Sequence, residues 1–244
     1  MPSRWRAMFA AVLALSGMTA SDAQTDYASR RAHMVAEVEA LYAETRAETG
    51  LAAMSPAVRA ALGKVERHRL VPPELAREAY RNHPLPIGEG QTISQPYIVA
   101  LSTDLIDPKP GQVVLEVGTG SGYQAAVLAE IVRQVYSIEI VPSLARSAQA
   151  RLAELGYRNI EVRIGDGYAG WPEKAPFDGI IVTAAAPRVP PALVQQLKPG
   201  GKMVIPVGGQ WGVQELEVIT RRADGGYDRK SVLPVRFVPL VPGK

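Results

Sequence analysis

The chain has 244 residues with 27 basic and 24 acidic side chains, a formal net charge of +3 and 47% hydrophobic residues, a balance typical of a globular protein with one core. It contains no cysteine, which excludes disulfides, thiolate metal ligands and a cysteine nucleophile, and we expect no metal site. No run of Lys and Arg is interleaved with aromatic residues, so we expect no nucleic-acid partner.

The amino terminus has the pattern of a secretory signal peptide. Arg4 and Arg6 precede an apolar run, Ala7–Met18, and small residues lead up to Ala23. Because this run is short for a membrane span, we predict a signal peptide over residues 1–23, with cleavage after Ala23 and no stable membrane association afterwards. We therefore expect a periplasmic or secreted protein. A misassigned start, an uncleaved extension and a cytoplasmic location are the alternatives.

Residues 24–90 are predicted to form a helical subregion. Apolar residues at helical spacing, and Ser55 as a cap before a proline, indicate where its helices lie. We expect these helices over Tyr27–Gly50, Pro56–Glu66 and Glu74–Tyr80. Residues 82–90 are rich in Pro and Gly and are predicted to be loop.

Residues 91–244 alternate between helix and strand patterns. Helices are expected over Tyr97–Ile106, Tyr123–Val132 and Pro142–Leu155, and strands over Val113–Val117, Val135–Glu139, Ile160–Ile164, Gly179–Thr183 and Lys202–Val207. Two further strands, Gln214–Thr220 and Ser231–Val238, flank Asp224-Gly225-Gly226 and indicate an antiparallel hairpin. The order predicts an α/β, Rossmann-like fold with a mostly parallel, doubly wound sheet and this C-terminal hairpin, with 24–244 as one structural unit.

A glycine-rich loop lies between the first of these strands and the next helix. Small residues there let the backbone approach a ligand closely, and the helix start offers free N–H groups. The candidate cofactor-binding residues in the loop are Glu116, Gly118, Thr119, Gly120, Ser121 and Gly122. Their G-x-G-x-G spacing differs from that of NAD enzymes, in which the third glycine lies one residue further along, although a tight turn without ligand has the same appearance.

Acidic residues mark the ends of three successive strands. Glu116 precedes the glycine loop, and Glu139 ends the next strand, where a carboxylate reaches a ribose diol. Asp166, followed by Gly167, comes after the third strand and is placed to accept a hydrogen bond from an adenine amine. Three carboxylates suit a cationic sulfonium cofactor, whereas a dinucleotide has little use for acids beside its pyrophosphate. The pattern therefore favours S-adenosylmethionine over NAD.

Several segments resemble the protein-L-isoaspartate O-methyltransferase family, over a stretch from Val58 to Leu240. The resemblance is carried by LPIG at 85–88, GQTISQPY at 90–97, LEVGTGSGY at 115–123, GDG at 165–167, PFDGIIVTAA at 176–185, PGG at 199–201, IPVG at 205–208 and VRFVPL at 235–240. Many methyltransferases share the glycine loop. The QTISQPY and RFVPL segments are narrower signatures.

The resemblance implies that residues 91–244 are a methyltransferase domain. It implies transfer of a methyl group from S-adenosyl-L-methionine to the free carboxylate of L-isoaspartyl and D-aspartyl residues in damaged proteins, leaving S-adenosyl-L-homocysteine. The methyl ester then collapses to a succinimide, which begins repair. The family pattern places the catalytic serine at Ser94 and substrate contacts at Thr92, Ile93 and Arg236. The alternative role for Arg236 is that of a surface cation on an edge strand. We expect the protein to be a monomer.

The implied chemistry matches the residues present. A carboxylate acceptor is ionised at neutral pH and needs no strong general base. Catalysis then depends on holding its oxygen in line with the S–CH3 bond and on removing water. A methyltransferase for a small molecule or another protein group, an NAD-dependent oxidoreductase and a non-catalytic binding module remain the competing interpretations.

Overall fold

The computed structural model describes residues 20–209 and 212–243, with side chains from residue 26 onward. The helices are α1 (Ala20–Glu44), α2 (Arg46–Thr49), α3 (Pro56–Lys64), α4 (Pro96–Ile106), α5 (Tyr123–Ala129), α6 (Pro142–Glu154) and α7 (Pro191–Gln195), with short 3-10 helices η1 (Arg67–Arg69), η2 (Pro73–Glu78) and η3 (Pro172–Lys174). The strands are β1 (Leu85–Gly88), β2 (Gln91–Ile93), β3 (Val113–Val117), β4 (Gln134–Glu139), β5 (Ile160–Ile164), β6 (Phe177–Val182), β7 (Leu197–Val207), β8 (Gln214–Arg221) and β9 (Tyr227–Val235).

The main sheet has the strand order β5-β4-β3-β6-β7-β8-β9. Strands β3 to β7 are parallel, and β8 and β9 complete the sheet as antiparallel strands. The predicted fold class is therefore confirmed. The chain winds outward from β3 in one direction through β4 and β5 and then returns to its other side at β6. Such a reversal opens a crevice at the carboxyl ends of the central strands, where ligands bind in folds of this kind.

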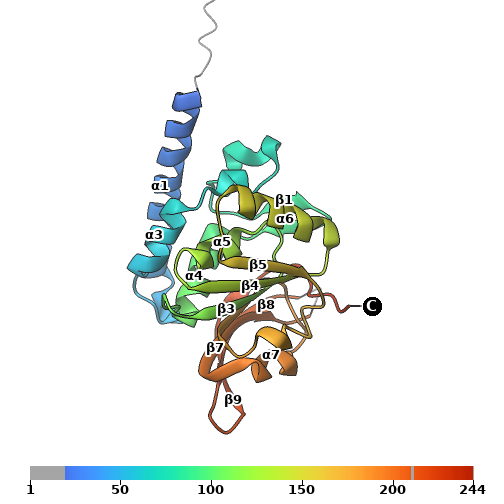
Figure 1. Cartoon of the computed structure of the whole chain (residues 1–244). Helices are drawn as coiled ribbons and strands as arrows, with labels where there is room; N and C mark the ends of the chain where they lie inside the picture. The colour runs from blue at the N-terminus through green and yellow to red at the C-terminus, as the bar shows by residue number, and fades with distance from the viewer. Residues whose placement is uncertain (1–19, 210–211, 244) are drawn as a thin grey trace, which may run out of the picture.

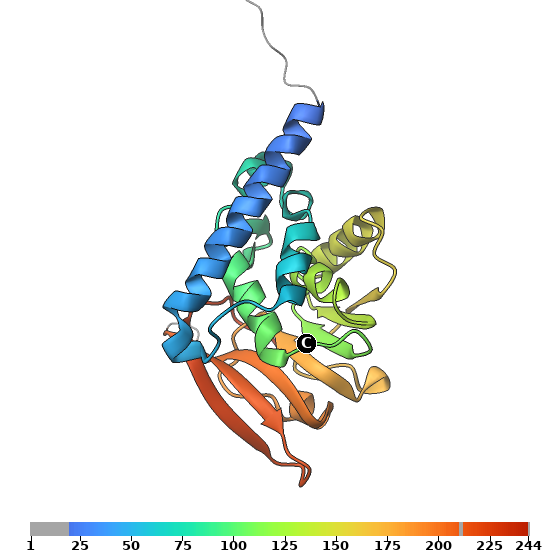
Figure 2. The ribbon, with the colours of Figure 1, turned by 90° about the vertical axis from the view of Figure 1, so that its left-hand side faces the viewer.

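Helices cover both faces of the main sheet. One face packs on α4 and α5, with α1 and α3 beyond them, and α7 packs on the other face. Figures 1 and 2 show α1 running along one side of the molecule with α3 and α4 beside it. Side chains of α1 and α3 such as Met34 and Leu62 belong to the same buried cluster as Val114 and Val204 of the sheet. The amino-terminal helices therefore share a core with the sheet.

Two local signals at the start of α3 were predicted and are present. The Ser55 hydroxyl accepts a hydrogen bond from the Val58 N–H at 3.2 Å, and proline occupies the first helical turn. Such a cap satisfies one of the N–H groups that a helix start leaves without a partner. Here local sequence alone sets the boundary.

The prediction of loop over residues 82–90 is wrong in part. Strand β1 pairs with β2 as a small antiparallel sheet, with Leu85 opposite Ile93. Leu85 and Ile87 are buried, whereas Pro86 and Gly88 are exposed, so the segment alternates as a half-buried strand does. Proline is tolerated at such an exposed strand edge, and its presence hid the alternation.

The two ends of the chain also differ from the expected elements. Helix α1 begins at Ala20, so the predicted cleavage point after Ala23 falls inside a helix, whereas residues 1–19 of the predicted signal peptide lie outside the described residues. Strand β9 spans Tyr227–Val235 and ends before Val238, because the Val238 carbonyl accepts a hydrogen bond from the Ala185 N–H at 2.8 Å. The final residues are thus drawn across the carboxyl ends of the strands.

No helix within residues 20–209 and 212–243 is long and apolar enough to cross a membrane.

Candidate active site

Two cavities adjoin at the carboxyl ends of the parallel strands. The first, here called the glycine-loop cavity, has about 560 Å³ of empty space and is lined by Gln91, Thr92, Val117, Gly118, Gly120, Ile138, Glu139, Ile140, Val141, Gly167, Thr183, Ala184, Val238, Pro239, Leu240 and Val241. The second, the Ser94 cavity, has about 1040 Å³ and is lined by Pro84, Thr92, Ser94, Gln95, Ile98, Thr183, Val213, Pro234, Val235, Arg236, Phe237 and Val238. Thr92, Thr183 and Val238 line both, so the two cavities meet at these residues.

The glycine loop crosses the floor of the first cavity. Gly118 has φ +98°, and a Cβ built there would lie 2.3 Å from Thr183 Oγ1, so no other residue fits without a shift. Gly118 and Gly120 line the cavity. Thr119 and Ser121 are buried, and neither they nor Gly122 lines it. Of the loop residues predicted to bind the cofactor, Gly118 and Gly120 therefore line the cavity, whereas the side chains of Thr119 and Ser121 are buried inside the protein.

Glu139 lies at the end of β4 beside the loop. One carboxylate oxygen accepts a hydrogen bond from Gly120 N–H at 2.8 Å, and the other accepts from Val141 N–H at 2.9 Å. A carboxylate can accept roughly four hydrogen bonds, so capacity remains for a ligand. Glu139 is the one charged residue among those that line the glycine-loop cavity in the described part of the chain.

Glu116 differs from the expectation that it faces the cofactor. It has no exposed surface and does not line the cavity, because successive side chains of β3 point to opposite faces and Glu116 points toward the helices. One carboxylate oxygen accepts a hydrogen bond from the Ser137 hydroxyl at 2.5 Å, and that hydroxyl lies 2.5 Å from Thr119 Oγ1. Burial raises the pKa of Glu116 to about 8. Glu116 therefore supports the glycine loop from inside the protein.

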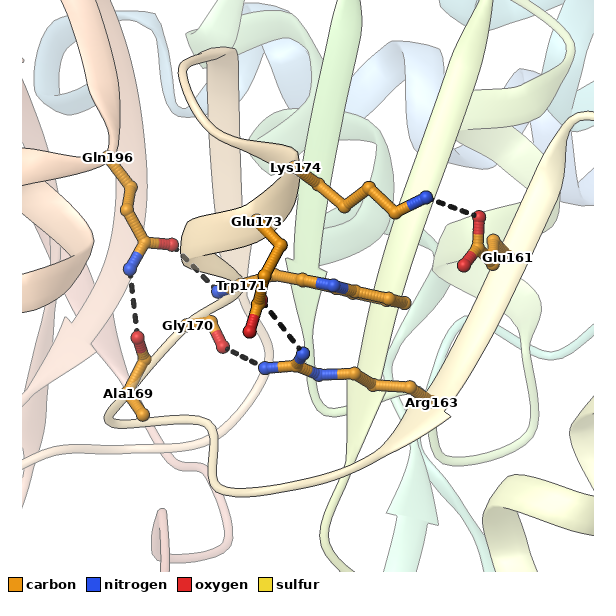
Figure 3. A network of polar contacts seen from close by, with 8 residues as sticks. All are labelled: Glu161, Arg163, Ala169, Gly170, Trp171, Glu173, Lys174 and Gln196. Carbon is orange, nitrogen blue, oxygen red and sulfur yellow. Dashed lines mark hydrogen bonds and ion pairs between the residues drawn. The ribbon is translucent and has the colours of Figure 1, made fainter.

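Asp166 and Gly167 lie near the start of the loop that follows β5. Gly167 lines the glycine-loop cavity, whereas Asp166 does not, and one Asp166 oxygen accepts from Tyr168 N–H at 2.8 Å. Figure 3 shows how the rest of this loop is held: the Gln196 side chain accepts from Trp171 N–H at 2.7 Å and donates to the Ala169 carbonyl at 2.8 Å.

Arg163 completes the network in Figure 3. Its guanidinium donates to the Gly170 carbonyl at 2.7 Å, pairs with Glu173 at 3.2 Å and lies 4.4 Å from the centre of the Trp171 ring. The loop that carries Asp166 is therefore tied to β5 through Arg163. It is also tied to the residue after α7 through Gln196.

The C-terminal residues form one wall of the glycine-loop cavity, which the sequence did not reveal. Leu240 N–H donates to the Ala185 carbonyl at 2.8 Å, and the Tyr168 hydroxyl donates to the Leu240 carbonyl at 3.2 Å. A side chain on Gly243 would meet Asp166 at 3.0 Å. Thr183 was also missed, although its place directly after a strand that points to the site is a usable signal.

The Ser94 cavity gathers three of the four residues predicted to act on the substrate. Ser94, Thr92 and Arg236 line it, whereas Ile93 is buried in the main core. Within the described residues, the Ser94 hydroxyl and the Arg236 guanidinium have no hydrogen-bond or ion-pair partner in the protein. Arg236 is the one charged residue in the described lining, and no histidine lines either cavity.

The fold and the two cavities define a class of enzyme. A doubly wound sheet, a glycine loop and a strand-end carboxylate are the features from which nucleoside sites are built in folds of this kind. The absence of cationic side chains from the described lining of the glycine-loop cavity fits a cationic S-adenosylmethionine and not a pyrophosphate. These features are those of an S-adenosylmethionine-dependent methyltransferase.

Comparisons with known proteins specify the family. Residues 36–244 match the family model for protein-L-isoaspartate(D-aspartate) O-methyltransferase. The chain is 57% identical over 207 residues to protein-L-isoaspartate O-methyltransferase 2 of Polaromonas sp., covering 85% of this chain and 98% of that protein. It is 52% identical over 238 residues to protein-L-isoaspartate O-methyltransferase 2 of Syntrophobacter fumaroxidans, covering 96% of each. The chain belongs to the protein-L-isoaspartate(D-aspartate) O-methyltransferase family.

A solved structure has the same fold. The beta-aspartate methyltransferase (PCMT) of Plasmodium falciparum, in complex with S-adenosyl-L-homocysteine, matches with a TM-score of 0.69 and 24% identity, covering 88% of this chain and 98% of that chain. The match to the family model and to these relatives confirms the predicted family, enzyme class and methyl-donor cofactor, and the solved structure confirms the fold. No group of three or more His, Cys, Asp or Glu able to hold a metal ion occurs among the described residues.

Proposed function

We propose that the chain transfers the methyl group of S-adenosylmethionine to the free carboxylate of isoaspartyl residues in damaged proteins, with the cofactor in the glycine-loop cavity and the acceptor in the Ser94 cavity. One observation carries this assignment. In the described lining, Glu139 is the lone charged side chain of the first cavity and Arg236 that of the second. A sulfonium cation and a carboxylate anion are therefore each offered an opposite charge, and the cavities meet between them.

The cofactor site follows from the contacts at the glycine loop. The backbone at Gly118 and Gly120 allows close approach of the donor, and the free acceptor capacity of Glu139 suits the ribose hydroxyls. Asp166 precedes the lining residue Gly167 and does not itself line the cavity, but its second oxygen has no partner among the described residues and can accept from an adenine amine at the cavity edge. Glu116 acts indirectly by supporting the loop.

The reaction joins a carboxylate oxygen to the methyl carbon as the S–CH3 bond breaks. An anion and a cation become a neutral ester and the neutral thioether S-adenosylhomocysteine, so charge is lost in the transition state and removal of water favours transfer. Ser94 donates a hydrogen bond that orients the acceptor without protonating it, and Arg236 attracts it. Attack of the neighbouring backbone nitrogen on the ester then expels methanol and forms the succinimide.

The cellular setting is a second part of the proposal. The signal-like residues 1–23 support export to the periplasm or beyond, with the mature protein acting as a monomer on damaged proteins there. Mass spectrometry of the mature amino terminus from fractionated cells tests this. An intact terminus in the cytoplasmic fraction would reject export without affecting the catalytic assignment.

The catalytic proposal is tested with two peptides that differ at one residue, isoaspartyl or aspartyl, and with S-adenosylmethionine labelled in its methyl group. We expect base-labile label on the isoaspartyl peptide and close to none on its partner. Equal labelling of both peptides would contradict the repair function and favour methylation of another group.

A further inference from the structure

We propose that Asn82 is a positioning residue for methyl transfer. Its side chain, which is not part of helix α4, caps the start of this helix and so holds Ser94 in place at the Ser94 cavity. The proposal rests on the function proposed above. Helix α4 begins at Pro96, and the side chain of its N-cap residue, Gln95, makes no capping hydrogen bond. Asn82 Oδ1 instead accepts a hydrogen bond from Tyr97 N–H at 3.0 Å. Since the first four N–H groups of a helix have no partner within it, this contact stabilises the start of α4.

The segment that carries Asn82 is itself anchored. Arg67 is fully buried, donates from Nε to the Ala79 carbonyl at 2.7 Å and donates from Nη2 to the His83 carbonyl at 3.3 Å. Its guanidinium lies 4.6 Å from the centre of the Tyr123 ring on α5. Residues on both sides of Asn82 are therefore tied to one buried cation, and the amide oxygen of Asn82 is held in place against α4.

Tyr97 is held from its other end as well. Its hydroxyl lies 2.5 Å from Thr45 Oγ1, and its ring packs edge-on against the Tyr42 ring at 5.9 Å. Tyr97 as a whole is 6% exposed. The first turn of α4 is therefore held by the hydrogen bond from Tyr97 N–H to the Asn82 side chain and by the contacts of the Tyr97 side chain with Thr45 and Tyr42.

The hydrogen bond between Tyr97 and Asn82 joins the two ends of residues 82–97, the segment that contains Ser94. Inside the Asn82–Tyr97 bond, Leu85 of β1 pairs with Ile93 of β2, and Ser94 follows directly. Ser94 thus has a strand pair on one side and a capped helix on the other. Without the Asn82 acceptor, the Tyr97 N–H would lose its partner and residues 94–96 would be free to move. A displacement of about 1 Å at a reacting group can cost roughly 100-fold in rate.

The test compares Asn82→Ala, which removes the acceptor, with Asn82→Asp, which keeps one. The matched control is Asn159→Ala, because Asn159 also ties distant backbone through its side chain, donating to the Ala129 and Val132 carbonyls, and lies in neither cavity. For each full-length protein we measure kcat and KM for an isoaspartyl peptide at saturating S-adenosylmethionine. Binding of S-adenosylhomocysteine by calorimetry and the melting temperature are measured on the same preparations.

For Asn82→Ala we expect kcat/KM for the peptide to fall about tenfold, in the range of a lost helix cap, with S-adenosylhomocysteine affinity within about twofold of wild type. Asn82→Asp restores peptide turnover, and Asn159→Ala lowers the melting temperature without changing peptide kinetics. Unchanged kinetics in Asn82→Ala would overturn the proposal. So would equal impairment of Asn82→Asp, or a parallel loss of cofactor affinity. A wild-type protein that does not methylate the isoaspartyl peptide rejects the proposed function and the positioning role together.

Discussion

The hydroxyl of Thr183 occupies the space that a side chain on Gly118 would need, and it donates a hydrogen bond to the Gly118 carbonyl at 2.6 Å. Gly118, the first glycine of the glycine loop, is therefore in close contact with Thr183, the residue that follows β6. Because Thr183 lines both cavities, this contact lies where the two cavities meet.

Gly118→Ala should abolish most cofactor binding. The new methyl group would meet Thr183 Oγ1 at 2.3 Å, and φ at this position is +98°, a conformation that L residues rarely adopt. We expect S-adenosylhomocysteine affinity, measured by calorimetry, to fall more than about tenfold. Gly63→Ala is the matched control, since nothing lies within 4 Å of its Cβ position in α3. Equal affinity in both variants would show that a side chain at position 118 is tolerated beside Thr183.

Glu139→Ala should weaken cofactor binding by at least about 1 kcal/mol, because the ribose loses its acceptor and the Gly120 and Val141 N–H groups lose theirs. The measurement is S-adenosylhomocysteine affinity by calorimetry, with the exposed Glu154→Ala of α6 as control. Wild-type affinity in Glu139→Ala would remove this residue from the site.

Glu116 should make stability fall as pH rises through neutrality. An unfolded carboxyl releases its proton near pH 4.5, whereas burial raises the pKa of the folded Glu116 to about 8, so between these values the folded state binds the additional proton. The loss is at most about 1.4 kcal/mol per pH unit. Glu116→Gln has no such proton. Urea unfolding at about pH 5, 6.5 and 8 should show a steeper decline for wild type than for the variant. Parallel declines would show that the buried carboxyl is ionised throughout.

Ser94→Ala should lower kcat for an isoaspartyl peptide by roughly 10- to 100-fold, since one hydrogen bond to a charged acceptor contributes about 1.5–3 kcal/mol. Cofactor affinity should not change, because Ser94 lines the acceptor cavity alone. Ser147→Ala in α6, which lines neither cavity, controls for loss of a hydroxyl. Retained turnover would show that Ser94 lines the cavity without contributing to catalysis.

Arg236→Leu should raise KM for the isoaspartyl peptide with a smaller effect on kcat. The exposed guanidinium has no protein partner among the described residues. In the proposed reaction it attracts the ionised acceptor through charge. The expected rise in KM is about tenfold and should shrink as salt screens the attraction. Steady-state kinetics at low and high ionic strength measure both effects, and a KM insensitive to the substitution would identify Arg236 as a surface cation.

Part of the site was readable from short-range patterns. The strand before the glycine loop, the glycine spacing and the strand-end position of Glu139 all depend on neighbours in sequence. The structure places Gly118, Gly120 and Glu139 at one cavity as expected. Glu116 was assigned to the same cavity because it also lies near a strand end, yet the alternation of side chains along β3 sends it to the opposite face.

Sequence by itself determined the alternating helix–strand order, the glycine loop and the family resemblance, because periodicity, turn residues and motifs are local properties of the chain. Tertiary structure alone decided which side chains meet: the Leu240 carbonyl against Tyr168 across 72 positions, and Asn82 against Tyr97 across 15. Such contacts arise when packing of the sheet and helices brings distant backbone together. No local pattern records which unpaired N–H or carbonyl group will find its partner there.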